Sequence, residues 1–130
     1  MQMNPSEQFA AHVAEARYED LPDPIVARAK ERLADSVGVM SAGARGVGIP
    51  GMVDMAKAWG GAEQASIFNY GDKVPARVAA FVNSLQLRSF DFEAIDAEGF
   101  LTRWPAHVTS TTVPATLALA EWKAMSGKDF

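Results

Sequence analysis

The sequence predicts an all-α domain with room for one short strand, and three observations support this. Apolar residues recur every three or four positions along several segments, which is the period of an amphipathic helix. Such a segment twice follows a capping residue and a proline, at Asn4-Pro5 and at Asp23-Pro24, as at a helix start. Only residues 65–70 have an extended character. The 130 residues fit one domain, or part of one.

Two helices are predicted in the first third of the chain. The first begins after Asn4, has Glu7 placed for a capping box, and carries Phe9 and Val13 on one face. The second begins at Asp23-Pro24 and ends among glycines. Its apolar positions step by three and four: Val26, Ala29, Leu33, Val37, Met40 and Ala44.

The remaining elements are shorter. A helix is predicted from Pro50 to Gly60, with Met55 and Trp59 directed inward. The next begins at Val74-Pro75, and its inward side is expected to carry Val78, Phe81, Val82 and Leu85. Residues 91–110 are predicted to be a loop, before a last helix at 112–125 that has Pro114 in its first turn. A strand at 65–70 alone cannot form a stable sheet, so we expect its partner outside the chain.

Composition excludes several classes of function. The net charge is −4 without a basic cluster, which argues against nucleic acid and anionic membrane surfaces as partners. No apolar run is long enough for a transmembrane helix, and no signal-peptide pattern is present, so we expect a cytoplasmic protein. The absence of cysteine excludes disulfides, thiolate nucleophiles and cysteine zinc sites. Because Lys128 to Phe130 directly follow the helix stop at Gly127, we expect an interrupted domain.

Four carboxylates crowd into a short stretch after the fourth predicted helix: Asp91, Glu93, Asp96 and Glu98. One interpretation is a solvated acidic loop. A second is a metal site, but the stretch lacks the glycine and the spacing of a calcium loop, so we predict no metal. A third is a single carboxylate that accepts a proton, with a basicity raised by burial.

His107 is the histidine best placed for chemistry. It precedes a polar run and the last helix, and imidazole exchanges a proton near neutral pH. A helix N-terminus nearby would favour an anion. The alternative is a histidine hydrogen-bonded within a loop. His12 falls inside the first helix and is interpreted as structural or surface.

Two arginines flank the acidic stretch. Arg88 stands three residues before Asp91, so an intrahelical ion pair is the plainer interpretation. Recognition of a substrate carboxylate by Arg88 or Arg103 is the functional one, since guanidinium geometry matches a carboxylate. Trp104 would then be a lid over a pocket or an anchor at an interface.

Read together, these segments resemble the N-terminal part of the MmgE/PrpD (2-methylcitrate dehydratase) family. The matching pieces follow one another in the family's order and cover nearly the whole chain. The pieces that carry the resemblance are Leu21-Pro22, residues 29–39, residues 78–83, residues 89–93, His107, Pro114-Ala115, residues 117–121 and residues 126–129.

The resemblance implies a fold and a chemistry. The family fold is a large helical domain with a smaller α+β lid, and residues 1–130 would be the N-terminal portion of the helical domain. Family activities are dehydration of 2-methylcitrate, decarboxylation of cis-aconitate and epimerisation of iminodisuccinate, without metal or organic cofactor. The aspartate that opens the family's Asp-Phe-Asp-Asp motif falls on Asp91, and its loop histidine falls on His107.

This chain departs from the family pattern at several positions. Asn83-Ser84 stands where the family usually has Asn-Gly, and Arg88 replaces a family histidine. Glu93-Ala94 replaces the second half of the acidic motif, and Ile95 stands where the family has threonine. Val108 follows His107 where the family has proline. Because of these departures, the substrate is not transferred from the family.

The sequence therefore predicts part of a lyase or isomerase that acts on a small di- or tricarboxylate. Asp91 and His107 are the predicted acid/base groups, and Arg88, Arg103 and Glu93 are the predicted substrate-binding residues. We expect the fourth and fifth helices to bring the aspartate and the imidazole to one cleft. The chain is expected to be inactive alone and to need a complementary polypeptide, in a homo- or hetero-oligomer. The alternative is a non-catalytic helical interaction module or a truncated remnant.

Overall fold

A computed structural model describes residues 3–94 and 107–130. The predicted all-α class is confirmed: these residues form helices and one short two-stranded sheet. The elements, in chain order, are α1 (Pro5–Glu15), a 3₁₀ helix (Tyr18–Asp20), α2 (Asp23–Gly43), α3 (Ile49–Trp59), β1 (Ala65–Ser66), β2 (Lys73–Val74), α4 (Ala76–Arg88) and α5 (Thr109–Lys123).

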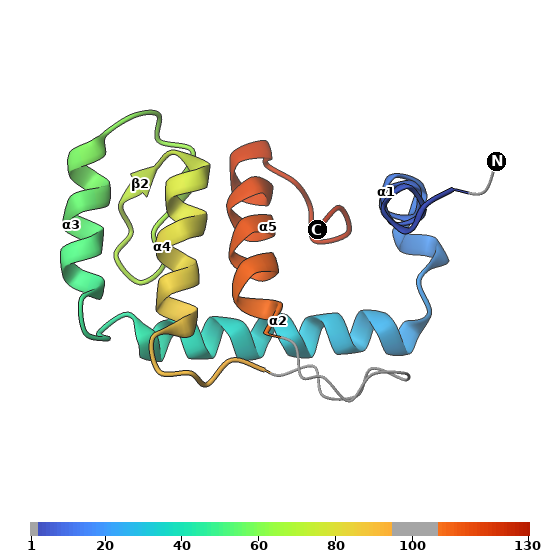
Figure 1. Cartoon of the computed structure of the whole chain (residues 1–130), viewed down its shortest axis with the longest axis horizontal. Coiled ribbons are helices and arrows are strands. Elements are labelled where there is room, and N and C mark those ends of the chain that lie inside the picture. Colours follow the sequence, from blue (N-terminus) through green and yellow to red (C-terminus); the bar gives the residue numbers. More distant parts are fainter. Residues whose placement is uncertain (1–2, 95–106) are drawn as a thin grey trace.

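The long helix α2 forms a base for the rest of the domain. Figure 1 shows α3, α4 and α5 standing side by side along it, with the β1–β2 hairpin between α3 and α4. The first helix, α1, lies at the far end of α2, away from α3 and α4 (Figure 1). None of the helices in the described part of the chain is long and apolar enough to cross a membrane.

Local capping explains where α1 begins. The Asn4 side chain accepts a hydrogen bond from the backbone N–H of Glu7 at 2.9 Å, and the Glu7 carboxylate accepts one from the Asn4 N–H at 2.9 Å. This is the predicted capping box. At α2 the predicted cap is wrong: Asp23 is the first helical residue, Pro22 stands at the capping position, and no side chain caps the helix. The Asp23 carboxylate lies in the first turn, where a negative charge still favours the helix dipole.

The core lies between α3, the hairpin, α4 and α5. Small and β-branched residues dominate it, so the elements approach each other closely. Its buried members are Ile49, Val53, Ala56, Ala65, Ile67, Val74, Val78, Ala79, Val82 and Ala118. Met40 of α2 and Leu87 of α4 are also fully buried.

A close crossing of α2 and α4 sets the position of the end of α4. A Cβ atom added at Gly43 would lie 1.8 Å from the carbonyl oxygen of Gln86. One added at Gly46 would lie 1.9 Å from the hydroxyl oxygen of Ser89. Only glycine permits this approach, so these two residues fix the place where Arg88 leaves the helix.

The predicted strand is paired within the chain, which corrects the expectation of an outside partner. β1 and β2 are antiparallel, with Ala65 opposite Val74 and Ser66 opposite Lys73. The buried side chain of Asn83 supports the hairpin from α4: it accepts a hydrogen bond from the Phe68 N–H at 2.9 Å and donates one to the Ser66 carbonyl at 3.1 Å. The sequence prediction overlooked Lys73–Val74 because two residues carry no periodic signal.

Some side chains expected to point inward are exposed. Met55, Trp59 and Phe81 keep 43%, 55% and 48% of their surface in solvent. The prediction was wrong because α3 and α4 pack through their smaller residues, with Ala56 and Ala79 fully buried.

The start of α5 also differs from the prediction. This helix begins at Thr109, three residues early, so the buried Pro114 lies inside the helix and not in its first turn. The partner that fixes this start is far away in the sequence: the backbone N–H of Ser110 donates to the carboxylate of Glu93 at 2.7 Å. A local capping pattern therefore could not reveal it.

Candidate active site

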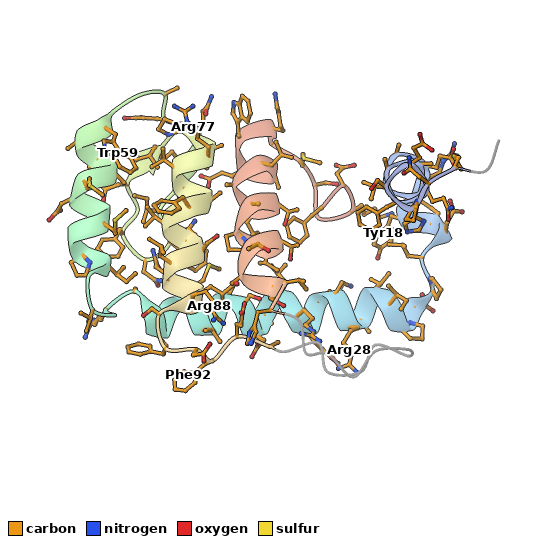
Figure 2. All side chains as sticks on the ribbon, in the orientation of Figure 1. Tyr18, Arg28, Trp59, Arg77, Arg88 and Phe92 are labelled. Carbon is orange, nitrogen blue, oxygen red and sulfur yellow. The ribbon has the colours of Figure 1, made fainter. Side chains whose placement is uncertain are left out.

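The candidate site lies where α4 ends and α5 begins, over the base formed by α2. Arg88 is the last residue of α4, and Figure 2 shows it at the lower end of that helix. The chain then turns through Asp91, which has a left-handed φ of 58°. Aspartate tolerates this conformation better than most residues, and its N–H donates to the Arg88 carbonyl at 3.1 Å.

Glu93 is the centre of the site. Its side chain has no exposed surface, and both carboxylate oxygens have partners. Oε1 lies 2.6 Å from Nη1 of Arg88 and 2.8 Å from Nδ1 of His107. Oε2 accepts the N–H of Ser110 at 2.7 Å, which places a negative charge at the N-terminus of α5. One carboxylate thus ties together α4, α5 and His107 in the segment that leads into α5.

Two opposing effects act on the pKa of Glu93. Burial raises the pKa, because it penalises the charged form. Hydrogen bonds from Ser110, through its hydroxyl and its backbone, and from Arg88 and His107 lower it and outweigh burial. The net result is a pKa below the ordinary value of 4.5, so Glu93 is an anion at neutral pH.

Arg88 joins the exposed groups to the buried one. Its Nη1 atom lies 2.7 Å from Oδ1 of Asp91, 2.6 Å from Oε1 of Glu93 and 3.0 Å from Nδ1 of His107. The Asp91 side chain is 71% exposed and that of His107 is 39% exposed. A ligand from solvent can therefore reach both groups beside a fixed positive charge.

The structure brings together most of the predicted site residues. Arg88, Asp91, Glu93 and His107 form one contiguous cluster, and the expected Arg88–Asp91 ion pair within one turn is part of it. Arg103 lies outside the described residues, as do Asp96, Glu98 and Trp104. His12 is exposed on α1, as expected for a surface histidine.

Sequence reasoning missed one member of the site, the backbone N–H of Ser110. The available signal was indirect. The residue before α5, Val108, offers no side chain that caps the helix, so the first N–H groups of α5 need a partner from elsewhere. The carboxylates of the acidic stretch after α4 could have been expected to accept these hydrogen bonds.

The site favours anion chemistry over metal binding. Both oxygens of Glu93 are already occupied by donors, which leaves Asp91 as the more accessible carboxylate. Among the described residues, no group of three or more histidine, cysteine, aspartate or glutamate side chains is arranged to hold a metal ion. An imidazole, an exposed carboxylate and a guanidinium at one rim are suited to moving a proton on a bound anion.

The structure is thus a helical domain with a cluster of charged and titratable side chains where α4 ends and α5 begins. A model of the MmgE/PrpD N-terminal domain matches residues 7–130. The chain belongs to the MmgE/PrpD family, which confirms the resemblance inferred from the sequence. A search of curated proteins found no match to the chain.

Proposed function

We propose that this chain provides part of the active site of a lyase or isomerase that abstracts a proton next to a carboxylate of a small di- or tricarboxylate. The observation that carries the proposal is the cluster of Arg88, Asp91, Glu93 and His107, with its exposed acid/base groups around one guanidinium nitrogen. Membership of a family that contains 2-methylcitrate dehydratase supports the reaction class.

The roles follow from exposure and contacts. His107 and Asp91 are the acid/base pair, because both are exposed and both contact Arg88. Arg88 binds a substrate carboxylate. Its contacts with the described residues all use Nη1, and we assign Nε and Nη2 to the ligand. A fixed cation there would stabilise the negative charge that forms when the proton leaves. We keep Arg103 as a second candidate for carboxylate binding and propose no cofactor.

Glu93 is better suited to positioning than to substrate binding. A buried anion would repel a substrate carboxylate, and each of its oxygens already has a donor. Its contacts instead hold Arg88 and His107 in place.

We further propose that a complementary polypeptide carrying the rest of the family fold completes the site. Two features support this. The site is open to water, whereas proton abstraction next to a carboxylate benefits from exclusion of water. An apolar hollow of about 510 Å³ lies between the start of α2, α5 and the residues after α5, lined among others by Leu33, Leu117 and Phe130. The matching model describes an N-terminal domain, so the natural occupant of this hollow is the remainder of the same fold.

Ligand binding by the chain tests the proposal directly. Citrate at millimolar concentration should shift the NMR signals of the His107 ring, whereas acetate at matched ionic strength should not. The exposed His12 ring is an internal control, and Arg88→Gln should abolish the citrate effect. Equal shifts with citrate and acetate, or an undiminished shift in Arg88→Gln, would contradict the proposal.

Turnover by the purified chain tests the need for a second polypeptide. The chain alone should not turn over 2-methylcitrate, cis-aconitate or iminodisuccinate. Steady turnover of any of them would contradict that need.

A second function, a non-catalytic helical interaction module, is supported by exposed apolar residues. Phe9 and Val13 on α1 are 70% and 61% exposed, and Trp59 on α3 is 55% exposed. The two functions differ in their dependence on His107. If the assembly keeps its activity in His107→Ala, the module interpretation gains support. If activity is lost while the assembly persists, the enzyme interpretation does.

A further inference from the structure

Arg88 contacts two carboxylates that differ in burial. Its Nη1 atom lies 2.6 Å from Oε1 of Glu93 and 2.7 Å from Oδ1 of Asp91. The Glu93 side chain has no exposed surface, whereas that of Asp91 is 71% exposed. Glu93 is also tied to α5, because its Oε2 accepts the N–H of Ser110 at 2.7 Å. One carboxylate is therefore fixed by the fold, and the other is held at the surface.

The contacts of Nη1 also differ in kind. It donates a hydrogen bond to Glu93, and its contact with Nδ1 of His107 at 3.0 Å has hydrogen-bond geometry too. The contact with Asp91 is an ion pair between exposed groups. Water competes for both charges of an exposed pair, so such a pair contributes little, whereas breaking a buried pair leaves a charge uncompensated. Asp91 is therefore the carboxylate that leaves Arg88 more easily.

The turn after α4 keeps the Asp91 carboxylate close to Arg88. Asp91 has a left-handed φ of 58°, and its N–H donates to the Arg88 carbonyl at 3.1 Å. A group tethered this close to its partner acts at a high effective concentration. A carboxylate that arrives from solvent must therefore compete with Asp91 for the charge of Arg88.

The charges of the cluster indicate which carboxylate gives way. One guanidinium carries a single positive charge, and Glu93 and Asp91 already bring two carboxylates to it. A ligand carboxylate on Nε and Nη2 is a third, and like charges at such short range repel one another. Glu93 is buried and held by Ser110, so the exposed Asp91 side chain is the one that can move away.

We propose that Asp91 sets the affinity of the site for carboxylates: it competes with a ligand carboxylate for Arg88 and is released from Arg88 when the ligand binds. This inference rests on the proposed function, in which Arg88 binds a carboxylate of a small di- or tricarboxylate. Release has a chemical consequence, because an oxygen turned away from the guanidinium is free to accept a proton. The substrate carboxylate thus frees Asp91 for proton transfer.

Asp91→Asn tests the competition, because asparagine has the same shape, tolerates the left-handed turn and lacks the charge. Citrate should bind this variant about two- to fivefold more tightly, the factor that an exposed ion pair contributes. The matched control is Glu31→Gln. Glu31 forms an exposed pair of the same three-residue spacing with Arg28 on α2, at 3.0 Å, and Figure 2 shows Arg28 well away from Arg88. This control should bind citrate as the unmodified chain does.

NMR titration of the three chains with citrate, at neutral pH and constant ionic strength, gives the dissociation constants. Suppose that citrate binds the unmodified chain and Arg88→Gln abolishes binding, but Asp91→Asn binds no more tightly. The competition is then wrong while the proposed function stands. An equal gain in Glu31→Gln would also overturn it, because overall charge would explain the effect. If citrate binds neither the unmodified chain nor Asp91→Asn, both proposals fail. Binding that is detected only in Asp91→Asn supports the competition.

A second measurement needs no substitution at Asp91. The ¹³C NMR signal of its side-chain carboxylate reports whether the group is paired. Citrate should move this signal in the unmodified chain toward its position in Arg88→Gln, where the guanidinium is absent. If the signal stays in place while the His107 ring responds to citrate, Asp91 is not released. That result would overturn the inference even if Asp91→Asn fails to fold.

Kinetics of the assembled enzyme separate the two roles of Asp91. Asp91→Asn should lower kcat, because the acid/base group is lost, and should lower KM about two- to fivefold, because the competitor is lost as well. His107→Ala should lower kcat without lowering KM. A KM that rises in Asp91→Asn would mean that Asp91 helps to bind the substrate, which contradicts the inference and leaves the acid/base role intact.

Discussion

Helix α5 has a bound carboxylate near each end, and the two clusters use the same physics for different purposes. Glu93 holds the first turn through the Ser110 N–H at 2.7 Å. Glu121, in the last turn, accepts the N–H and the hydroxyl of Ser66, both at 2.7 Å, and contacts Nζ of Lys73 at 3.0 Å. In both cases burial raises the carboxyl pKa, but hydrogen bonds outweigh it and the pKa is lowered.

The difference lies in what surrounds each carboxylate. Within the described part of the chain, the partners of the Glu121 side chain belong to the β1–β2 hairpin, so that cluster fastens the hairpin to α5. The partners of Glu93 include the partly exposed imidazole of His107 and a guanidinium that also holds the exposed Asp91. A bound carboxylate is thus no sign of a site by itself. Exposed titratable groups held beside it distinguish the Glu93 end.

Enzyme activity provides the strongest test of the difference between the Glu93 and Glu121 ends of α5. In the assembled enzyme, His107→Ala should lower the turnover of whichever family substrate is accepted by about 10²–10⁴-fold, the usual contribution of a general acid or base. Glu121→Gln should change it no more than a few-fold. Steady-state kinetics on 2-methylcitrate, cis-aconitate and iminodisuccinate provide the measurement. Equal losses from both variants would mean that the two ends of α5 do not differ in function.

A second prediction concerns the helix crossing beneath the Glu93 end. Gly43→Ala should lower the free energy of unfolding by about 1–3 kcal/mol, because the new methyl group overlaps the Gln86 carbonyl. Gly38, in the same helix, has open space where a Cβ atom would lie. Gly38→Ala should therefore raise the free energy of unfolding by about 0.5–1 kcal/mol. Urea denaturation measures both changes. Stabilisation by Gly43→Ala would show that α2 and α4 do not cross as closely as described.

The two carboxylates should also differ in how much each contributes to the free energy of unfolding. Glu93→Gln should lower the free energy of unfolding by about 2 kcal/mol, as expected when a buried charge-assisted hydrogen bond is lost. Glu121→Gln should lower it by only about 1 kcal/mol, since its side chain is 35% exposed and solvent weakens its ion pair. Urea midpoints of the two variants at neutral pH provide the comparison. A larger loss of unfolding free energy in Glu121→Gln than in Glu93→Gln would mean that Glu121, and not Glu93, stabilises the fold more.

The smallest expected effect is on how the free energy of unfolding changes at acidic pH. Both glutamates have a folded-state pKa below the ordinary 4.5, so their stabilisation is fully present above that value. It is lost as the pH falls through the lowered folded-state pKa of each. The free energy of unfolding should therefore fall less steeply below pH 4.5 in Glu93→Gln and Glu121→Gln than in the unmodified chain. Parallel acid curves for all three proteins would mean that neither carboxylate contributes to acid sensitivity.

Much of the helical framework could be predicted from local sequence. The capping box at Asn4 joins residues within one turn, so a single sequence contains the whole signal. The start of α2 was placed correctly to within one residue, although Asp23 is the first helical residue and not the cap. The faces of α3 and α4 were less predictable. The spacing of Phe81 and Trp59 along their helices is that of core residues. The helices nevertheless pack against each other through alanines, and only the tertiary packing determines which face is buried.

The candidate site shows the same limit. Arg88, Asp91 and His107 were identifiable as residue types near helix ends, and the family pattern pointed to two of them. The contact of Glu93 with the Ser110 N–H joins residues 17 positions apart and has no local signature. Its burial, which favours positioning over substrate binding, is likewise a property of the packed domain.

The sequence by itself determined which residues form helices, in what order, and which chemical groups stand near their ends. These features arise from contacts within one turn of helix, where the spacing of residues fixes their geometry. Only the tertiary structure decided that β1 finds its partner in β2, that α5 begins at Thr109, and that a buried glutamate faces an imidazole. Those contacts join distant parts of the chain, and their geometry depends on how α2, α4 and α5 pack against each other.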